Sequence, residues 1–584
     1  MGRPWFFLIL FLSFPIGLLS KETVKATVVV YGAEAVAETD ENFVCATIDW
    51  WHPSKCSNQC PFGLSYVLNL DTNHPHLAKA IRAFDPLRIR IGGSLQDQVI
   101  YGVGNSSVSP CLEFQESETG LFGFSQGCLS MNRWDELNSL FNKTGAIVTF
   151  GLNALHGRRQ IGGQEWVGAW NSSNARSFIE YTISRGHRID SWEFGNELCG
   201  TGIGARVGAK QYGEDVIALK AMLDDLYVNY TNKKPSVVAP GGFFDQQWYG
   251  ELLRVSGPSV VGAISHHIYN LGAGVDPSVI DRILDPSHLG RIAETFRDVQ
   301  LTVQRNGPWA SAWVSEAGGA YNGGSRLFSG TFVDSFWYLD QLGMASIFNT
   351  KVYCRQTLVG GNYGLLDTIT FVPNPDYYSA LLWHRVMGKR VLGVEHGGSP
   401  SLRTYAHCSK QKAGVTLLFI NLSNTTAFDI KIQPNSTVQT KSPMYELKRM
   451  VKWVGKRASN NGWTSKQKKL VGEETSKREE YHLTPKDGQL RTQTMLLNGS
   501  PLELTLDGDI PALDPVLVSE GAPLVIPGRA SRTVNRPRSP WMSIPALLSA
   551  IANQITPATK AALDQHHDAF NVSYKKLNGY LSMV

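Results

Sequence analysis

Strands and helices alternate along the first two thirds of this 584-residue sequence, and this alternation limits the possible folds more than any other feature. Apolar runs typical of buried strands end near residues 91, 150, 194, 239, 265, 315 and 348, and we place one more strand at residues 352–358. Amphipathic stretches that predict helices occur between them, at residues 77–84, 134–141, 173–185, 209–228, 289–305 and 331–342. Strands joined by helices form parallel sheets. Eight such units over about 300 residues predict an α/β fold with a (β/α)8 TIM barrel, and an open parallel sheet is the alternative.

The sequence has a different character on both sides of this region. Within residues 22–50, apolar and polar side chains alternate around residues 23–31 and again around residues 43–48, which predicts strands. Beyond residue 385, short alternating runs are separated by turns and no helical period intervenes, so we expect an antiparallel β domain. We assign residues 46–384 to the barrel and residues 21–45 and 385–527 to the β domain.

The N-terminus has the features of an export signal. It combines a positively charged start, about fifteen apolar residues and a small residue at position 20, so we assign residues 1–20 to a signal peptide. An N-terminal membrane anchor is the alternative. An exported chain with eight cysteines is expected to form disulfides. Cys56 and Cys60 are close together, and Cys111 and Cys128 bracket one loop, but the pairing stays open.

Acceptor sequences for N-linked glycans agree with export. Nine such sequences occur, and the one at Asn498 is the weakest because Pro501 follows it. We expect a secreted protein of the extracellular space or cell wall, with a lysosome or vacuole as the alternative compartment. The expected glycosylation sites are Asn105, Asn142, Asn171, Asn229, Asn421, Asn424, Asn435 and Asn571.

Several classes of function find no support in the sequence. There is no Gly-rich phosphate loop, no CxxC pair and no HExxH motif, so neither a nucleotide site nor a structural zinc site is indicated. The net charge of +5 is too small to indicate a nucleic-acid-binding protein. Lysines and arginines cluster at residues 448–456 and 466–477, which indicates a solvated loop, with a site for a polyanion as the alternative.

Two of the predicted strands end in a glutamate. The run from Trp192 to Phe194 stops at a glycine and is followed by Asn196 and Glu197, and the run at residues 309–315 ends at Glu316. Barrel enzymes carry their catalytic groups at the C-terminal ends of the strands. Glycosidases use two carboxyl groups, one to protonate the leaving oxygen and one to attack or stabilise the sugar cation. The pair therefore predicts a glycosidase, although an ion pair or a helix cap is the alternative for each glutamate alone.

The motifs around these glutamates resemble those of a known family. Trp192-Glu-Phe-Gly-Asn-Glu197 is similar to the acid/base motif of heparanases and β-glucuronidases of glycoside hydrolase family 79. The resemblance covers residues 24 to 527 and is strongest to the plant heparanase-like proteins. Other segments match family motifs in the same order: residues 150–154, 170–175, 265–269, 315–324, 361–363 and 481–490.

This resemblance implies a role for individual residues and no cofactor or metal. Glu197 matches the proton donor on the fourth barrel strand and Glu316 the nucleophile on the seventh, which implies a retaining double displacement. Asn196 matches the residue that holds the sugar 2-hydroxyl. Gly323, Gly324, Asn362 and Tyr363 match the part that receives the uronic acid carboxylate, and backbone N–H groups beside a tyrosine hydroxyl suit that task. The remaining implied substrate contacts are Asp49, Gly93, Ser94, His267 and Tyr269.

The resemblance also implies a β-sandwich built from both ends of the chain, and this chain departs from the family in three places. Leu198 replaces the usual proline after Glu197. The connection at residues 104–133 is short where animal heparanases carry an excised segment, so we expect a single uncleaved chain.

The third departure is the C-terminus. Relatives add one more strand after the equivalent of residue 527 and end near a cysteine paired with the Cys408 position. Here residues 528–538 are basic and do not alternate, and no cysteine follows Cys408. We therefore expect a buried free thiol at Cys408, an unpaired sheet edge and a poorly ordered tail at residues 528–584. A product of altered transcript processing and a partner-binding helix are the two explanations of this tail.

These observations together predict a secreted retaining β-glucuronidase that removes β-linked glucuronic acid from glycans or glycoconjugates. An endo-β-glucuronidase acting on heparan-sulfate-like polymers is the alternative among enzymes, and a non-catalytic glycan-binding protein is the alternative of another class. We expect a monomer whose partner is a glycan or proteoglycan containing glucuronic acid, with peripheral association to a membrane or cell wall. We expect no nucleic-acid partner.

Overall fold

The computed structural model describes residues 22–55, 62–63, 65–104, 111–230, 233–435 and 477–537. Several predictions fall outside them: the signal peptide, Cys56 and Cys60, the glycosylation sites Asn105 and Asn571, the two basic clusters apart from Lys477, and the tail from residue 538 onward. None of the helices in the described ranges combines the length and the apolar character that a membrane crossing requires.

Eight parallel strands close into a barrel, so the predicted TIM barrel is confirmed and the open sheet is excluded. Each strand pairs with the strands before and after it in the chain, and the eighth pairs with the first. The strands are β2 (Val44–Asp49), β3 (Arg88–Gly92), β6 (Ile147–Leu152), β9 (Ser191–Phe194), β10 (Ser236–Phe243), β11 (Ala263–Ile268), β13 (Ser311–Ala317) and β15 (Thr350–Arg355).

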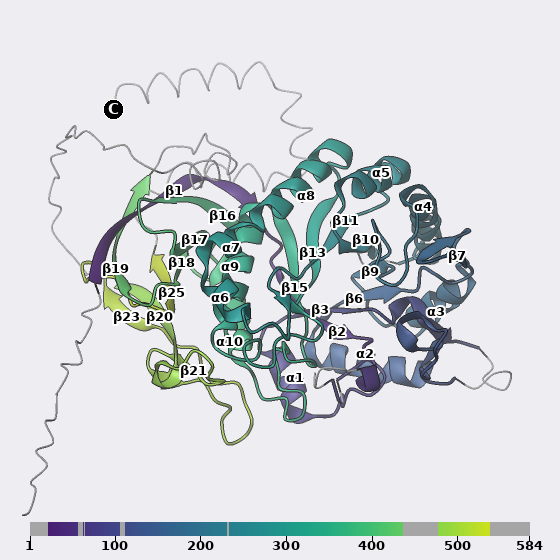
Figure 1. Ribbon diagram of the computed structural model, residues 1–584, viewed down its shortest axis with the longest axis horizontal. Coiled ribbons are helices and arrows are strands. Elements are labelled where there is room, and N and C mark those ends of the chain that lie inside the picture. The colour runs from purple at the N-terminus through teal and green to yellow at the C-terminus, as the bar shows by residue number, and fades with distance from the viewer. Residues whose placement is uncertain are drawn as a thin grey trace, which may run out of the picture.

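Helices cover the outside of the barrel (Figure 1). Most are amphipathic, because one face packs on the strands and the other meets water; in α1, for example, Leu77, Ala78, Ala80 and Ile81 are buried. The main helices are α1 (Pro75–Arg82), α2 (Met131–Thr144), α3 (Ser173–Ser184), α4 (Ala209–Leu226), α5 (Gln246–Ser256), α8 (Ala293–Asn306), α9 (Asp334–Ile347) and α10 (Pro375–Val386).

Shorter elements lie in the loops. The helical ones are α6 (Val279–Leu284), α7 (Pro286–Gly290), η1 (Pro53–Lys55), η2 (Gln96–Gln98), η3 (Leu121–Gly123) and η4 (Lys486–Gly488). Three small strand pairs are β4 (Val99–Gly102) with β5 (Gly127–Ser130), β7 (Arg159–Gly162) with β8 (Glu165–Val167), and β12 (Gly272–Ala273) with β14 (Ala320–Tyr321).

Two strand assignments from the sequence need correction. Residues 345–348 do not form a strand, because residues 345–347 end α9 and Phe348 follows as its cap. The missing barrel strand is β2, which the predicted boundary after residue 45 divided between the N-terminal strands and the barrel. Only the last turn of α9 reads as a strand, because the helix is buried on nearly all sides there and its apolar residues show no helical period.

The second domain is one continuous, strongly curved sheet of eleven strands beside the barrel (Figure 1). It is mostly antiparallel as predicted, but β1 pairs in parallel with β19. Its order is β22 (Ser500–Pro501), β21 (Met495–Leu497), β20 (Lys477–Pro485), β25 (Ala530–Pro537), β18 (Gly414–Asn421), β17 (Leu402–Ser409), β16 (Met387–His396), β1 (Glu22–Glu38), β19 (Thr426–Asn435) and β24 (Val525–Ile526), with β23 (Val516–Ser519) also paired to β20.

Alternate residues of this sheet face two different cores. Val28 of β1, and Leu417 and Phe419 of β18, join a core inside the curved sheet. Leu418 and Ile420 of β18 point the other way and join the core of the barrel. A strand with apolar residues on both faces is buried on both faces, so the sheet is fixed to the barrel through its second face.

A buried ion pair reinforces the contact between the two domains. Asp340 of α9 accepts hydrogen bonds from Arg403 Nε at 2.7 Å and from the Tyr405 hydroxyl at 2.5 Å, both on β17. The carboxylate of Asp340 is fully buried, so its charge needs a partner within the protein. Arg403 of the second domain supplies that partner.

The predicted tail begins too early. Residues 530–537 form β25, which pairs along its length with β18 and also with β20, so this segment lies inside the sheet and closes the edge that was expected to be open. Its polar side chains find partners: Arg532 Nη1 lies 3.2 Å from Glu480, and Asn535 donates to Glu479 at 2.9 Å. Val534 is fully buried in the core of the sheet.

One prediction about the cysteines needs correction. Disulfides join Cys111 to Cys128 across their loop and Cys45 to Cys354 between neighbouring barrel strands. Cys408 is a free thiol, as predicted, but it is half-buried rather than buried.

The predicted glycan at Asn421 is wrong, because Asn421 is fully buried and its amide donates to the backbone carbonyls of Thr426, Ile526 and Pro527. Asn435 is half-buried. The other predicted sites within the described residues are exposed: Asn142, Asn171, Asn229 and Asn424.

Candidate active site

The two predicted glutamates meet at the C-terminal mouth of the barrel. Glu197 lies in the turn after β9, the fourth barrel strand, and Glu316 lies near the end of β13, the seventh. One carboxylate oxygen of each and a ring nitrogen of His267 all lie within 4.8 Å of one another. Both glutamates are 7% exposed, so they are largely sheltered from solvent.

The turn after β9 holds Glu197 in a conformation that few residues adopt. Its φ is +56°, in the left-handed region, which costs a non-glycine residue about 1–3 kcal/mol. Hydrogen bonds fix the turn: Glu197 N donates to Gly241 O at 2.6 Å, and Asn196 N donates to the buried carboxylate of Asp97 at 2.8 Å. Backbone strain of this kind is concentrated at functional sites.

Glu316 is surrounded by groups that favour its ionised form. The Tyr269 hydroxyl donates to one carboxylate oxygen at 2.5 Å, and Arg90 Nη1 donates to the other at 2.8 Å. Burial alone would raise the pKa of Glu316, but the charges of His267 and Arg90 and these hydrogen bonds outweigh burial and hold the pKa below its usual value. Glu316 is therefore a carboxylate over a wide pH range.

Arg90 organises this part of the site, and the sequence analysis did not single it out. Its buried guanidinium donates to Glu193 at 2.6 Å, to Glu316 at 2.8 Å and to the Asn196 side chain at 2.9 Å. It thus ties β3 to the ends of β9 and β13. The sequence shows Arg90 only as one of two arginines that alternate with apolar residues in a predicted strand, a pattern that does not reveal that its side chain is buried.

The adjacent histidines His266 and His267 point to opposite sides of their strand and have different partners. The Nδ1 atom of His267 is 2.9 Å from Glu197 and 4.0 Å from Glu316, so its ring lies between the two carboxylates. His266 packs against Phe296 on the other side of the strand. Burial, and then the neighbouring His267, lower the pKa of His266 to about 3, so it is neutral. The sequence-based assignment of His267 to the site agrees with this geometry.

Asp49 ends the first barrel strand close to Glu316. Burial, and then the charge of Glu316, raise the pKa of Asp49 to about 7. Gln356 donates a hydrogen bond to its carboxyl group. A Cβ atom on Gly93 would lie 2.3 Å from Asp49 Oδ1, so only glycine fits there, and Ser94 follows it half-buried. These three predicted residues therefore do come together.

The predicted carboxylate receptor is assembled immediately beyond Glu316. Asn362 N donates to Gly323 O at 2.7 Å, and a Cβ on Gly324 would lie 2.7 Å from the ring of Tyr363. A Cβ on Gly318 would lie within 3.0 Å of the rings of both Tyr363 and Tyr269. The receptor residues thus lie against one another and against the tyrosine that binds Glu316.

Glu197, His267 and Glu316 are close enough together to hold a metal ion. Arg90 already places a positive charge 2.8 Å from Glu316. A cation bound there would be repelled by this guanidinium, so the arrangement is better suited to metal-free carboxylate chemistry.

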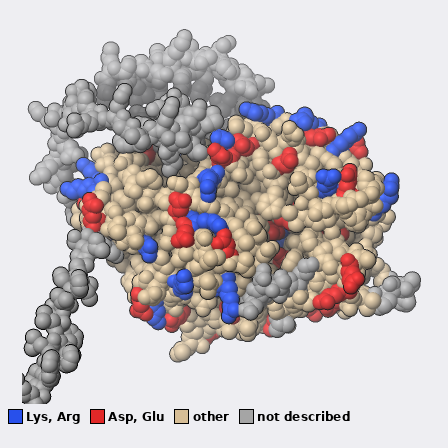
Figure 2. Space-filling model, viewed as in Figure 1, with Lys and Arg blue, Asp and Glu red and all other residues tan. Residues whose placement is uncertain are grey.

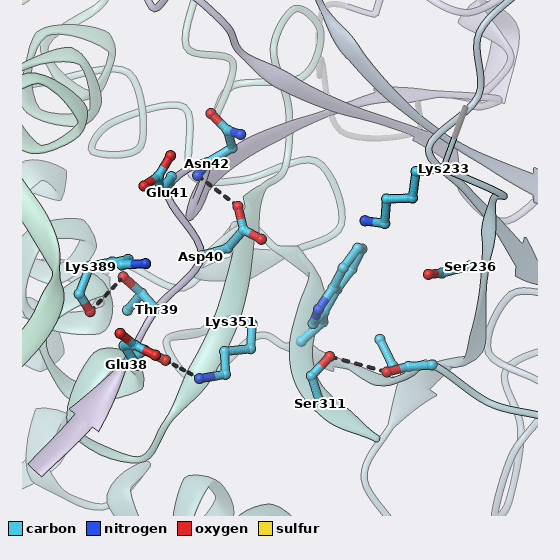
Figure 3. A pocket seen from close by; sticks show the side chains of 13 residues that line it. Glu38, Thr39, Asp40, Glu41, Asn42, Lys233, Ser236, Ser311, Lys351 and Lys389 are labelled. Atoms are coloured by element: carbon cyan, nitrogen blue, oxygen red, sulfur yellow. Dashed lines mark hydrogen bonds between the residues drawn. The ribbon is translucent and has the colours of Figure 1, made fainter. Parts of the chain in front are cut away.

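A hollow lies at the N-terminal end of the barrel strands, opposite the two glutamates (Figure 3). It has a volume of about 540 Å³ and is lined by the starts of the barrel strands, including Ser236 and Ser311, and by Lys233 and Lys351. Trp313 also lines it. In TIM-barrel enzymes this end of the barrel serves stability, and active sites lie at the other end, which here is the end with the two glutamates.

Comparison with known proteins agrees with this geometry. The family model described as glycosyl hydrolase family 79, N-terminal domain, matches residues 25–343. Heparanase-like protein 1 of Arabidopsis thaliana is 57% identical over 514 residues, which cover 87% of this chain and 92% of the relative. This chain belongs to glycosyl hydrolase family 79. It is a heparanase-like glycoside hydrolase, and the non-catalytic alternative is set aside.

Two further relatives of this family 79 hydrolase are informative. Baicalin-beta-D-glucuronidase of Scutellaria baicalensis is 39% identical over 521 residues, covering 86% of this chain and 90% of the relative. The crystal structure of a 4-O-alpha-L-rhamnosyl-beta-D-glucuronidase from Fusarium oxysporum has the same fold, with a TM-score of 0.58 at 14% identity over 87% of this chain and all of that one.

A second family model, the RCD1-SRO-TAF4 (RST) plant domain, matches residues 536–573. The sequence analysis did not anticipate this match. Most of the matched segment lies outside the described residues, so the two explanations of the tail stay open.

Proposed function

We propose that this hydrolase is a secreted, retaining β-glucuronidase in which Glu197 is the acid/base and Glu316 the nucleophile. The observation that carries the proposal is the short distance between the two carboxylates, whose oxygens lie within 4.8 Å. Retaining glycosidases separate their carboxyl groups by about 5–5.5 Å, whereas inverting enzymes leave about 6.5–9.5 Å for a water molecule.

The two environments match the two roles. Glu316 is ionised and positioned by Tyr269 and Arg90, which suits a group that attacks the anomeric carbon. Among the residues that the structure describes, no arginine or tyrosine binds the Glu197 carboxylate as Arg90 and Tyr269 bind Glu316, and its hydrogen-bond partner is the His267 ring. In the first step Glu197 gives its proton to the leaving oxygen as Glu316 forms the glycosyl ester. In the second step Glu197 takes a proton from water, which attacks the same carbon and releases the sugar with retained configuration.

The proposed specificity for a uronic acid rests on the receptor of Gly323, Gly324, Asn362 and Tyr363. It adjoins Glu316, so a sugar whose anomeric carbon faces Glu316 can direct its carboxylate toward these residues. The name of the relative from Scutellaria baicalensis supports the same sugar.

The endo-acting alternative on heparan-sulfate-like polymers finds less support. A sulfated chain needs cations along its binding surface, and of the adjacent arginines Arg158 and Arg159 only Arg159 is exposed. Arg158 is buried and bound to Asp215 at 2.5 Å, so it is not free to meet a sulfate group. On the face seen in Figure 2, basic and acidic side chains are intermingled and form no extended patch of one sign.

Secretion is part of the proposal. The two disulfides, Cys45–Cys354 and Cys111–Cys128, suit an oxidising compartment. Expression in a plant secretory system followed by sequencing of the mature N-terminus tests it, and a protein that begins at Met1 in the cytosol would contradict it.

The activity is tested by the release of p-nitrophenol from its β-glucuronide and its β-glucoside at acidic pH. We expect kcat/KM for the glucuronide to be at least about 100-fold higher, because a polar receptor left empty is costly. Tyr363→Phe should lower the ratio of kcat/KM for the glucuronide to kcat/KM for the glucoside. Similar rates on both sugars would contradict the receptor, and absence of activity on both would contradict the proposed function.

A further inference from the structure

An exposed aromatic ring stands beside the two glutamates. Phe243, the last residue of β10, is 42% exposed. The centre of its ring is 6.4 Å from that of His267 and 6.3 Å from that of Tyr269. These two rings are the direct partners of Glu197 and Glu316, so Phe243 belongs to the same mouth of the barrel and has a face open to solvent.

The end of β10 lies on the side of Glu197. The Gly241 carbonyl accepts a hydrogen bond from Glu197 N at 2.6 Å, and a Cβ on Gly242 would lie 3.0 Å from Glu197 Cα. An acid/base group protonates the leaving oxygen, so the leaving group must lie next to that residue. The receptor for the sugar carboxylate adjoins Glu316 instead. Phe243 is therefore placed on the leaving-group side of the scissile bond.

Phe243 begins a short segment without cationic side chains. The segment from Phe243 to Trp248 has no lysine or arginine, and the carboxylate of Asp245 caps helix α5 by accepting from Trp248 N at 2.9 Å. Ile203, also 42% exposed, donates its backbone N–H to Glu197 O at 3.0 Å and so adds a second apolar side chain near the acid. A sulfated sugar finds no cationic partner in this segment, whereas a flat apolar group gains contact with the ring.

We propose that Phe243 is the platform on which the leaving group stacks, and that this protein therefore prefers glucuronides whose leaving group is aromatic or otherwise flat and apolar. This inference rests on the proposed β-glucuronidase activity and names its substrate class. Phe243 would thus determine specificity for the leaving group, and it is not among the residues predicted to contact the sugar.

The test compares two glucuronides that share the sugar and differ in the leaving group. 4-Methylumbelliferyl β-glucuronide has a flat aromatic leaving group, and β-glucuronyl fluoride has a single atom. We expect Phe243→Ala to lower kcat/KM for the aryl substrate about tenfold more than for the fluoride, equivalent to about 1.4 kcal/mol. Phe243→Trp should retain the preference, because it keeps an aromatic face.

The matched control is Trp309→Ala. Trp309 is also exposed, at 37%, but it precedes β13 at the opposite end of the barrel, so its loss should leave both substrates unchanged. Equal losses on the two substrates in Phe243→Ala would overturn the inference, since the ring would then support the catalytic groups and not the leaving group. A wild-type protein that cleaves neither glucuronide would overturn the proposed function itself.

Discussion

The placement of β25 inside the second sheet can be tested with one conservative substitution. Val534 lies in the middle of this strand and is 0% exposed. Val534→Ala removes the equivalent of two buried methylene groups, at about 0.8 kcal/mol each, and leaves a small cavity. We expect the free energy of unfolding to fall by about 2 kcal/mol.

Val516→Ala is the matched control, because Val516 lies in β23 of the same sheet but is 47% exposed. It should change the free energy of unfolding by less than about 0.5 kcal/mol. Guanidinium titrations followed by circular dichroism and by tryptophan fluorescence measure both variants. Equal effects of the two substitutions would refute the buried strand and restore the expectation of a loose tail from residue 528.

The remaining predictions concern the site, the domain contact and the thiols. Because the pKa of Asp49 is raised to about 7, its carboxyl is protonated at acidic pH and gains a charge beside Glu316 as the pH rises through 7; kcat/KM should fall there, and Asp49→Asn should remove that part of the decline. An unchanged pH profile would contradict this role. Asp340→Ala leaves Arg403 buried without its partner and should lower the free energy of unfolding by about 3–5 kcal/mol in the same titrations, whereas an effect below about 1 kcal/mol would show that the pair does not fix the domains. Alkylation of denatured, unreduced protein should label Cys408, and mass spectrometry that finds it in a disulfide would contradict the free thiol.

The barrel could be predicted from the sequence because its signal is repeated. Seven of the predicted strands correspond to barrel strands, and β2 was missed only as a member of the barrel, since residues 43–48 follow the N-terminal strands without a clear break. Helices α5 and α10 were missed as well. Helix α10 is buried over most of its surface, so it shows no amphipathic period.

The meeting of the two glutamates could be predicted because both of them end apolar strands, and the resemblance to the family then supplied the other predicted site residues. Arg90 could not be found in this way. A charged residue in an alternating strand reads as solvent-facing, and only closure of the barrel turns that position inward, where three partners bind it.

Strand β25 was missed for a related reason. Its sequence is polar and basic, and its place between β18 and β20 is set by backbone pairing with segments far away in the chain. Phe243 gave no signal either, because the predicted strand ends near residue 239 and Phe243 falls in the loop expected after it.

The assignment of Glu197 as the acid and Glu316 as the nucleophile is tested most directly by the dependence of one variant on its leaving group. The measurement is kcat/KM of Glu197→Ala on p-nitrophenyl β-glucuronide and on an alkyl β-glucuronide, relative to wild type, with Glu316→Gln as the control. An activated leaving group needs no protonation, so we expect Glu197→Ala to lose at least about 100-fold more on the alkyl substrate than on the aryl substrate, whereas Glu316→Gln should lose turnover on both. Equal losses on the two substrates in Glu197→Ala would contradict the account.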